Sequence, residues 1–205
     1  MTSSAPAPGR PIRSQRTPRC PGCWLPPALC LCAELPRLAV RARVVLVTHR
    51  REAFTSTNTG RIAARVLEGA SVRVRGVRGA PPPAPLPEGR RLALFPAPGA
   101  RELSPADAAG ERVVLLVPDG TWSQARRLLR RDEDLRDIEP VALPPAGPTR
   151  YGLRCTTREG AVCTIEAIAR ALAVLEGDEI EARLLELFDR FVERHRCVRE
   201  GRFER

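Results

Sequence analysis

The chain has 205 residues, 43% hydrophobic and 28% charged, which is the composition of an ordinary globular domain. No apolar run approaches the roughly 20 residues of a membrane span, and the N-terminus lacks the apolar segment of a secretory signal. We therefore expect a cytoplasmic protein with no membrane contact. The net charge is +10 and every basic residue is an arginine. Codon bias in a GC-rich genome accounts for the missing lysine, whereas the charge excess itself predicts a polyanionic partner, most simply nucleic acid.

The first 36 residues differ in pattern from the rest of the chain. Residues 1–17 are rich in Pro, Ser and Arg and poor in apolar residues, which predicts a disordered tail. Residues 18–36 hold four cysteines in a short, proline-rich stretch. The remainder, residues 37–205, carries the regular patterns of a folded domain.

Within that remainder, apolar runs typical of buried strands alternate with helical periodicity. Strands are predicted at 42–49, 71–77, 90–99, 112–120 and 139–144. Helices are predicted at 59–69, 121–136, 164–177 and 178–196, and the proline-rich segment 79–89 is predicted as a loop. Strands that alternate with helices indicate an α/β fold with a largely parallel sheet flanked by helices.

Capping signals give the expected helix starts. Thr121 with Gln124 three residues later matches a capping box. Thr164 is a plausible cap for the next helix, which has Glu166 in its first turn. Asp178 and Glu181 have the same capping-box spacing.

The stretch CPGCWLPPALCLC contains a C-x₂-C pair followed by a C-x-C pair. Two close pairs can present four thiolates to one tetrahedral ion, and Zn²⁺ favours such sites in reducing compartments. Four thiolates leave no open coordination position, so the expected metal is structural. A redox pair or small apolar residues are the alternatives. The expected ligands of this N-terminal zinc knuckle are Cys20, Cys23, Cys30 and Cys32.

Polar segments follow several predicted strands, and ligands of open parallel sheets bind beyond the carboxyl ends of the strands. These segments are THRREAFTSTNTGR (48–61), FPAPGA (95–100), PDGTW (118–122) and YGLRCTTREGAVCTIEA (151–167). Asp119 either caps the following helix or, because Thr121 already does so, leaves its carboxylate for a substrate proton. Trp122 either packs in the core or stacks on a ligand ring. His49 is a structural residue or part of a binding loop.

Together these segments resemble the DTW-domain family. The cysteine cluster and the segments HRRE…NTGR, LFPAPGA, VPDGTWSQARR and LRCTTREGAVCTIEA stand in the family's order, from Cys20 to about Ala171. Asp119, Thr121 and Trp122 form the motif that gives the family its name. Arg50 stands where the family often has proline. This single difference does not weaken the resemblance.

The resemblance implies a SPOUT-like α/β fold with a C-terminal knot that holds S-adenosylmethionine, so residues 37–205 would be the DTW catalytic domain. It also implies a tRNA-uridine aminocarboxypropyltransferase, which moves the 3-amino-3-carboxypropyl group of S-adenosylmethionine to N3 of a tRNA uridine and releases methylthioadenosine. An RNA methyltransferase using the same donor and a non-catalytic, zinc-stabilised RNA-binding module are the alternatives.

The implied chemistry assigns roles to residues. Asp119 is expected to be the base or hydrogen-bond acceptor for N3–H, and Trp122 to stack on a base. The expected catalytic residues are Asp119, Thr121 and Trp122. The expected donor-binding residues are Phe95, Pro96, Gly99, Pro118, Gly120, Arg154, Thr164, Ile165 and Glu166, with Arg154 or the Thr164 helix start facing the methionine carboxylate. The expected RNA-binding residues are His49, Arg50, Arg51, Asn58, Arg61, Arg126, Arg127 and Arg130; for the arginines near 126–131, a solvated helix face is the alternative.

Overall fold

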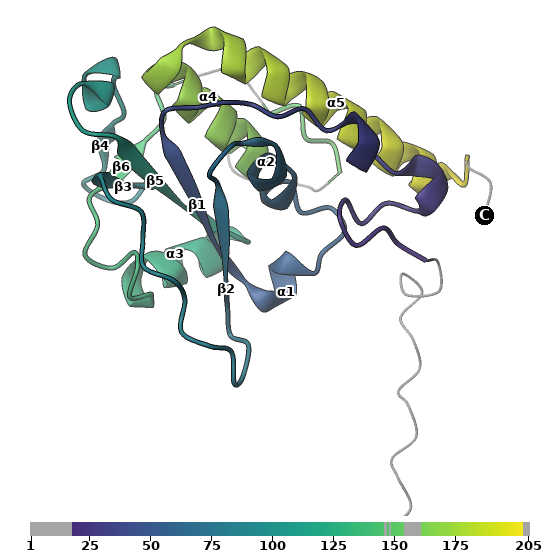
Figure 1. The fold of residues 1–205 in the computed structure, drawn as a ribbon, viewed down its shortest axis with the longest axis horizontal. Coiled ribbons are helices and arrows are strands. Elements are labelled where there is room, and N and C mark those ends of the chain that lie inside the picture. The colour runs from purple at the N-terminus through teal and green to yellow at the C-terminus, as the bar shows by residue number, and fades with distance from the viewer. Residues whose placement is uncertain (1–17, 146, 148, 154–160, 203–205) are drawn as a thin grey trace, which may run out of the picture.

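The computed structural model describes residues 18–145, 147, 149–153 and 161–202, so the predicted tail lies outside the described part. Its centre is a six-stranded sheet in the order β2-β1-β5-β3-β6-β4, in which every neighbouring pair is parallel. Helices cover both faces of the sheet (Figure 1). This arrangement confirms the predicted α/β class.

Most predicted elements form close to their predicted bounds. The strands are β1 (Arg43–His49), β2 (Ser71–Arg75), β3 (Arg90–Leu94), β4 (Arg101–Glu102), β5 (Val113–Asp119) and β6 (Pro140–Ala142). The α-helices are α1 (Arg50–Ala53), α2 (Gly60–Val66), α3 (Trp122–Arg131), α4 (Thr164–Glu176) and α5 (Asp178–Glu200). Among the described residues, short 3₁₀ turns lie at Pro27–Leu29, Cys32–Glu34 and Pro105–Ala108.

Alternate residues of the central strands pack on opposite faces of the sheet. On one face, Val113, Leu115 and Val117 join the core shared with α2, α4 and α5. On the other face, Val114 and Leu116 pack with residues of α3 and of the segment that follows it. Burial on both faces explains why β5 is an almost uninterrupted apolar run.

The structure corrects several predicted boundaries. The two-residue strand β4 and the four-residue helix α1 are too short to give a periodic signal. Helix α3 ends at Arg131 rather than 136, because the backbone turns extended at Asp132. Helix α5 continues to Glu200 rather than 196.

Two predicted caps are wrong. Cys163 is the N-cap of α4 and Thr164 is its first residue; the Thr164 hydroxyl donates instead to Asp119. Asp178 does not cap α5, which follows Gly177 directly and has no side-chain cap. Gly177 has a φ of 103°, a value that favours glycine and lets the chain turn from α4 into α5 without a linker.

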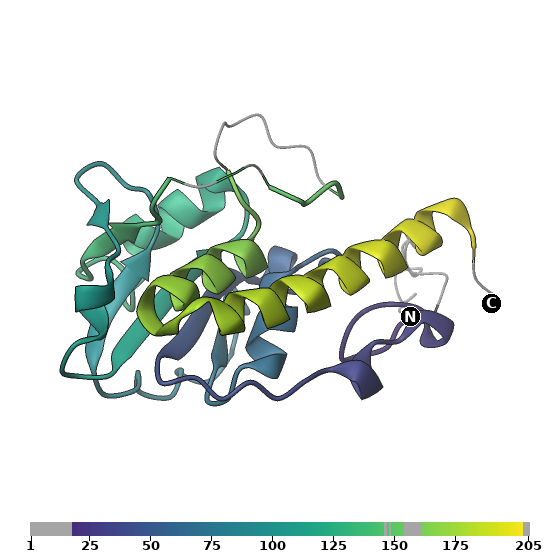
Figure 2. The same ribbon diagram turned by 90° about the horizontal axis from the view of Figure 1, so that it is seen from above.

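The cysteine-rich segment packs on the main domain. Cys23, Leu25 and Leu31 are buried in the same core as α4 and α5. Glu34 forms ion pairs with Arg190 and Arg194 of α5. Figure 2 shows this segment beside the C-terminal half of α5.

The expected C-terminal knot involves the connection between β6 and α4. That connection includes residues 154–160, which lie outside the described part, so the knot stays a prediction. Among the described helices, none combines the length and the apolar character that a membrane crossing requires.

His195 gives the fold a specific acid sensitivity. It is buried on α5 with its ring edge-on to Phe191, and burial lowers its pKa to about 4 from 6.5. As the pH falls from about 6.5 to 4, the unfolded chain therefore binds a proton that the folded chain does not. We predict that stability falls over this window, by about 3 kcal/mol at most.

Urea denaturation of the wild type, His195→Gln and His49→Gln between pH 7 and 4 measures this effect. We expect the free energy of unfolding to depend less steeply on pH in His195→Gln than in the wild type. The wild-type dependence should persist in His49→Gln, which removes the other histidine. An unchanged slope in His195→Gln would contradict the prediction.

Candidate functional site

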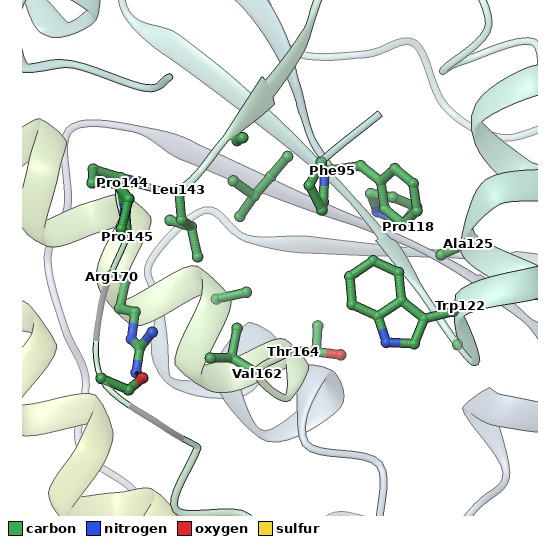
Figure 3. A pocket seen from close by; sticks show the side chains of 16 residues that line it. Phe95, Pro118, Trp122, Ala125, Leu143, Pro144, Pro145, Val162, Thr164 and Arg170 are labelled. Carbon is green, nitrogen blue, oxygen red and sulfur yellow. Dashed lines mark hydrogen bonds between the residues drawn. The ribbon is translucent and has the colours of Figure 1, made fainter. Parts of the chain in front are cut away.

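A cavity of about 590 Å³ opens at the carboxyl ends of three strands, next to the first turns of α3 and α4 (Figure 3). Its volume lies within the range of small-molecule sites, about 300–1,000 Å³. The lining is mostly apolar and consists of Leu94, Phe95, Pro96, Pro118, Gly120, Trp122, Ala125, Ala142, Leu143, Pro144, Pro145, Gly147, Val162, Thr164, Ala167 and Arg170.

Six residues singled out from the sequence line this cavity: Phe95, Pro96, Pro118, Gly120, Trp122 and Thr164. Four residues after β6 also line it, although no sequence signal beyond their position after a strand marked them: Leu143, Pro144, Pro145 and Gly147. Val162 and Ala167 lie in the segment 151–167 that the sequence singled out, although neither was named as a site residue, and Arg170 was missed. Ala167 and Arg170 lie one and two turns into α4, where the helical spacing from Thr164 could have indicated them.

Two aromatic rings form one wall of the cavity. The ring centroids of Phe95 and Trp122 lie 5.5 Å apart, with the planes tilted by 55°. Trp122 is half-buried and begins α3. Gly120 has a φ of 150°, and a Cβ there would lie 2.7 Å from Gln124 Oε1, so this turn requires glycine.

Thr121 acts as the cap of α3. Its hydroxyl accepts from the backbone N–H of Gln124 at 3.3 Å, and its own N–H donates to Gln124 Oε1 at 2.7 Å. The predicted capping box is therefore confirmed. Because the Thr121 hydroxyl is used in the cap, we assign Thr121 the role of positioning Trp122.

Asp119 lies at the end of β5 and is 2% exposed. Its carboxylate does not cap α3. One oxygen accepts from the Thr164 hydroxyl at 2.6 Å, and the other accepts from the Asn58 amide at 2.6 Å. Asp119 does not line the cavity, whereas Thr164 does. The hydroxyl of Thr164 thus stands between the carboxylate and the cavity.

The surroundings of Asp119 favour its protonated form. Burial raises its pKa, and the nearby Glu52 carboxylate acts in the same direction, while the hydrogen bonds from Thr164 and Asn58 oppose the rise. The Asn58 amide also contacts Glu52, at 3.3 Å. A carboxyl group with a raised pKa is better able to accept a proton near neutral pH than an exposed aspartate is.

Glu166 organises the start of α4 without reaching the cavity. Its buried carboxylate accepts from Thr149 Oγ1, from the N–H of Arg150 and from the N–H of Cys163, at 2.5, 2.7 and 2.9 Å. It ties the segment after β6 to α4, so we assign it a structural role rather than donor contact.

Two further expected donor-binding residues, Ile165 and Gly99, do not line the cavity. Ile165 is buried and its N–H donates to Thr59 Oγ1 at 3.3 Å. Gly99 lies in the turn after β3 and is not in the lining. Arg154 lies outside the described residues.

The expected RNA-binding residues differ in how exposed they are to solvent. Asn58 is buried against Asp119, and Arg61 is half-buried with its guanidinium 5.0 Å from the centre of the Trp24 ring, so neither is available as a surface contact. His49 accepts the backbone N–H of Arg51 at 3.3 Å and caps α1. The exposed members are Arg50, Arg51, Arg126, Arg127 and Arg130.

The four cysteine sulfurs form a compact cluster. All lie within 4.8 Å of one another, with Sγ atoms of Cys20 and Cys32 at 3.5 Å and those of Cys23 and Cys30 at 3.7 Å. Four ligands at 2.3 Å around a tetrahedral zinc ion lie about 3.8 Å apart, so the cluster fits that ion. These distances are much too long for disulfide bonds.

The crowding of the thiols also favours a cation. Burial, with the neighbouring thiols, raises the pKa of Cys32 to about 12, so a thiolate at Cys32 needs a nearby positive charge. Helix α2 brings such charge close: Arg65 Nη2 donates to Cys32 Sγ at 3.8 Å. Gly22 leaves room for this contact, because a Cβ there would lie 2.6 Å from Cys32 Sγ.

Comparison with known proteins identifies the family. Residues 17–196 match the family model of the DTW domain. The chain belongs to the DTW-domain family. The match spans both the cysteine cluster and the cavity.

Relatives of this DTW-domain chain carry one recurrent name. A tRNA-uridine aminocarboxypropyltransferase 2 of Drosophila melanogaster is 30% identical over 170 residues, which cover 78% of this chain and 68% of that protein. A tRNA-uridine aminocarboxypropyltransferase A of Arabidopsis thaliana is 26% identical over 208 residues, covering 84% and 79%. A Macaca fascicularis relative, tRNA-uridine aminocarboxypropyltransferase 2, is 26% identical, and the match covers 80% of this chain and 58% of the relative.

Among solved structures, the SAM-dependent rRNA:acp-transferase Tsr3 from Vulcanisaeta distributa shares the fold. The TM-score is 0.54 at 18% identity, with 80% of each chain covered. The DTW-domain chain therefore has the architecture of that protein.

The cysteine cluster yields a direct test. We predict about one zinc ion per chain, and that its removal by a chelator destabilises the protein, because the cluster is part of the main core. A loss of about 3 kcal/mol in the free energy of unfolding corresponds to a fall of roughly 10 °C in melting temperature for a chain of this length.

Metal analysis and thermal melts of the wild type, Cys32→Ser and Cys197→Ser measure both effects. Cys197 lies on α5 and is not one of the four clustered cysteines, so Cys197→Ser should retain the metal. A wild type purified without metal, with a melting temperature unaffected by chelator, would rule out the structural zinc.

Proposed function

We propose that this protein is a tRNA-uridine aminocarboxypropyltransferase that uses S-adenosylmethionine as the donor. The DTW-domain match and the names of the relatives support this activity. The observation that carries the proposal is the cavity itself, in which an aromatic wall and the Thr164–Asp119 pair meet at the carboxyl edge of a parallel sheet.

The reaction is a nucleophilic substitution at carbon. The bond between uridine N3 and the γ-carbon of the aminocarboxypropyl group forms while the bond from that carbon to sulfur breaks. The electron pair returns to the sulfonium sulfur, so methylthioadenosine leaves as a neutral thioether and needs no acid. The N3 proton must go to a base, and the alignment of N3 with the γ-carbon selects that carbon over the methyl group.

Thr164 and Asp119 form a relay suited to that proton. The Thr164 hydroxyl faces the cavity and donates to Asp119 at 2.6 Å, so it can accept N3–H while passing its own proton to the carboxylate. The raised pKa of Asp119 suits it to receive that proton. In this proposal Thr164 contacts the substrate and Asp119 acts through it, whereas the sequence placed Asp119 in direct contact with N3.

Phe95 and Trp122 supply flat surfaces for the adenine or uracil ring. Base stacking on an aromatic side chain contributes about 1–3 kcal/mol per base. The turns around Pro96, Pro118 and Gly120 bring backbone close to the same space.

Helix α3 offers a surface for the tRNA backbone. Trp122 and Ala125 line the cavity, while Arg126, Arg127 and Arg130 are exposed on the same helix, and no ion pair within the described part of the chain involves these three arginines. Arg50 and Arg51 at the end of β1 extend the basic surface. Zinc in the cysteine cluster has a structural role, because four protein thiolates leave no position for a substrate.

Incubation of the purified protein with tRNA and S-adenosylmethionine tests the activity. We expect methylthioadenosine and an aminocarboxypropylated uridine, detected by mass spectrometry of tRNA nucleosides. Thr164→Val should reduce kcat by about 100-fold through loss of the proton relay, whereas Thr164→Ser should retain most activity. Binding of methylthioadenosine should change little in Thr164→Ser.

The product distinguishes the possible outcomes of this assay. S-adenosylhomocysteine would identify a methyltransferase, and no donor-derived product would favour a non-catalytic RNA-binding module. Equal activity of Thr164→Val and the wild type would exclude the relay.

The basic face of α3 gives a second prediction. Each of Arg126→Gln and Arg130→Gln should weaken tRNA binding and reduce the slope of log K against log salt by nearly one unit per lost phosphate contact. Filter binding at several salt concentrations measures this slope. Arg183→Gln, an exposed arginine on α5, is the matched control, and an equal effect in the control would show that only net charge matters.

A further inference from the structure

The described lining of the cavity contains a positive charge that no ion pair in the described part of the chain neutralises. Arg170, two turns into α4, is the one charged side chain among the described lining residues, and the rest of the lining is apolar or uncharged. None of these described lining residues is acidic. A half-buried guanidinium in apolar surroundings is poorly solvated, and its charge favours an anionic ligand.

Arg170 is only partly used by the protein. Its Nη2 donates to the carbonyl of Gly147 at 2.9 Å, which fixes the side chain toward the segment after β6. No ion pair with it is found in the described part of the structure. A guanidinium has five N–H donors in a planar fork, the geometry that matches a carboxylate.

The position of Arg170 indicates which anion it meets. In Figure 3, Arg170 lies at one end of the cavity and Trp122 at the other, with Val162 and Thr164 between them. S-adenosylmethionine is similarly divided: a flat adenine at one end, a carboxylate at the other and the sulfonium between. The aromatic wall fits the adenine, and the guanidinium of Arg170 fits the carboxylate.

Resting on the proposed function, we propose that Arg170 binds the carboxylate of the aminocarboxypropyl group of S-adenosylmethionine. This proposal assigns to Arg170 the contact that the sequence had predicted for Arg154 or for the helix start at Thr164. The anchor explains how the site selects the group it transfers. With the carboxylate held by Arg170 and the adenine at the aromatic wall, the γ-carbon lies in the middle of the cavity, beside Thr164.

Three ligands separate the carboxylate contact from the rest of the site. S-adenosylmethionine has the carboxylate, decarboxylated S-adenosylmethionine lacks only that group, and methylthioadenosine lacks the entire aminocarboxypropyl chain. Isothermal titration of each ligand into the wild type, Arg170→Met, Arg170→Lys and the control Arg183→Met measures the contribution of the contact.

We expect the wild type and Arg183→Met to bind S-adenosylmethionine about 10- to 100-fold more tightly than its decarboxylated form, which is the range of a charge-assisted hydrogen bond. Arg170→Met should abolish this preference and leave methylthioadenosine binding within about threefold of the wild type. Arg170→Lys should restore part of the preference, because it keeps the charge without the fork.

Other results would overturn the proposal. An unchanged preference in Arg170→Met would show that the carboxylate binds elsewhere. An equal loss for all three ligands would show that Arg170 only supports the cavity wall through Gly147. Weaker tRNA binding by Arg170→Met, with an unchanged preference for S-adenosylmethionine over its decarboxylated form, would show that Arg170 contacts a phosphate of the tRNA instead. A wild type that binds none of the three ligands would instead contradict the proposed function.

Discussion

The buried carboxylate of Asp119 is the contact on which the site depends. It joins three segments that are distant in sequence, namely the end of β5, the turn before α2 and the first residue of α4. Burying a carboxylate is costly unless it is hydrogen-bonded, and both oxygens are satisfied. Gly60 lets these segments approach, because a Cβ there would lie 2.9 Å from both Leu46 and Thr164. The position of α4, and with it of Thr164 and Arg170, follows from this contact.

Helix α2 connects that site to the cysteine cluster. Its N-terminal turn is held by Asn58, whose side chain accepts the N–H of Arg61 and donates to Asp119. One and two turns later, Arg61 and Arg65 face Trp24 and Cys32. The two arginines lie on the side of the helix that meets the thiolates, where positive charge is favourable. The cluster therefore stabilises a helix that helps to fix Asp119, so a metal bound by the four cysteines would contribute to the geometry of the site without contacting a substrate.

Much of this arrangement could be predicted from the sequence, because the signals are local. The buried run of β5, the capping box at Thr121 and the spacing of the cysteines each depend on a few neighbouring residues. The contacts of Asp119 depend on packing across the sheet, and the sequence therefore placed its carboxylate in the cavity rather than behind Thr164. The same limit explains why Asn58 was assigned to RNA and why Arg170 was missed. Both are ordinary residues in sequence, and only the fold brings them to the site.

For the proposed activity, the distribution of charge separates the surface for tRNA from the cavity for the donor. Arginines are exposed on α3, whereas the cavity behind that helix is apolar and holds a single described cation at its far end. A polyanion is attracted to the outer surface, but a nucleotide base that enters the cavity passes Trp122 and leaves its phosphates outside. Because α3 contributes both Trp122 and the exposed arginines, a donor bound at the ring and a tRNA backbone bound at the arginines would be held in fixed register. The rigid start of α3, set by Gly120 and the Thr121 cap, is what makes that register possible.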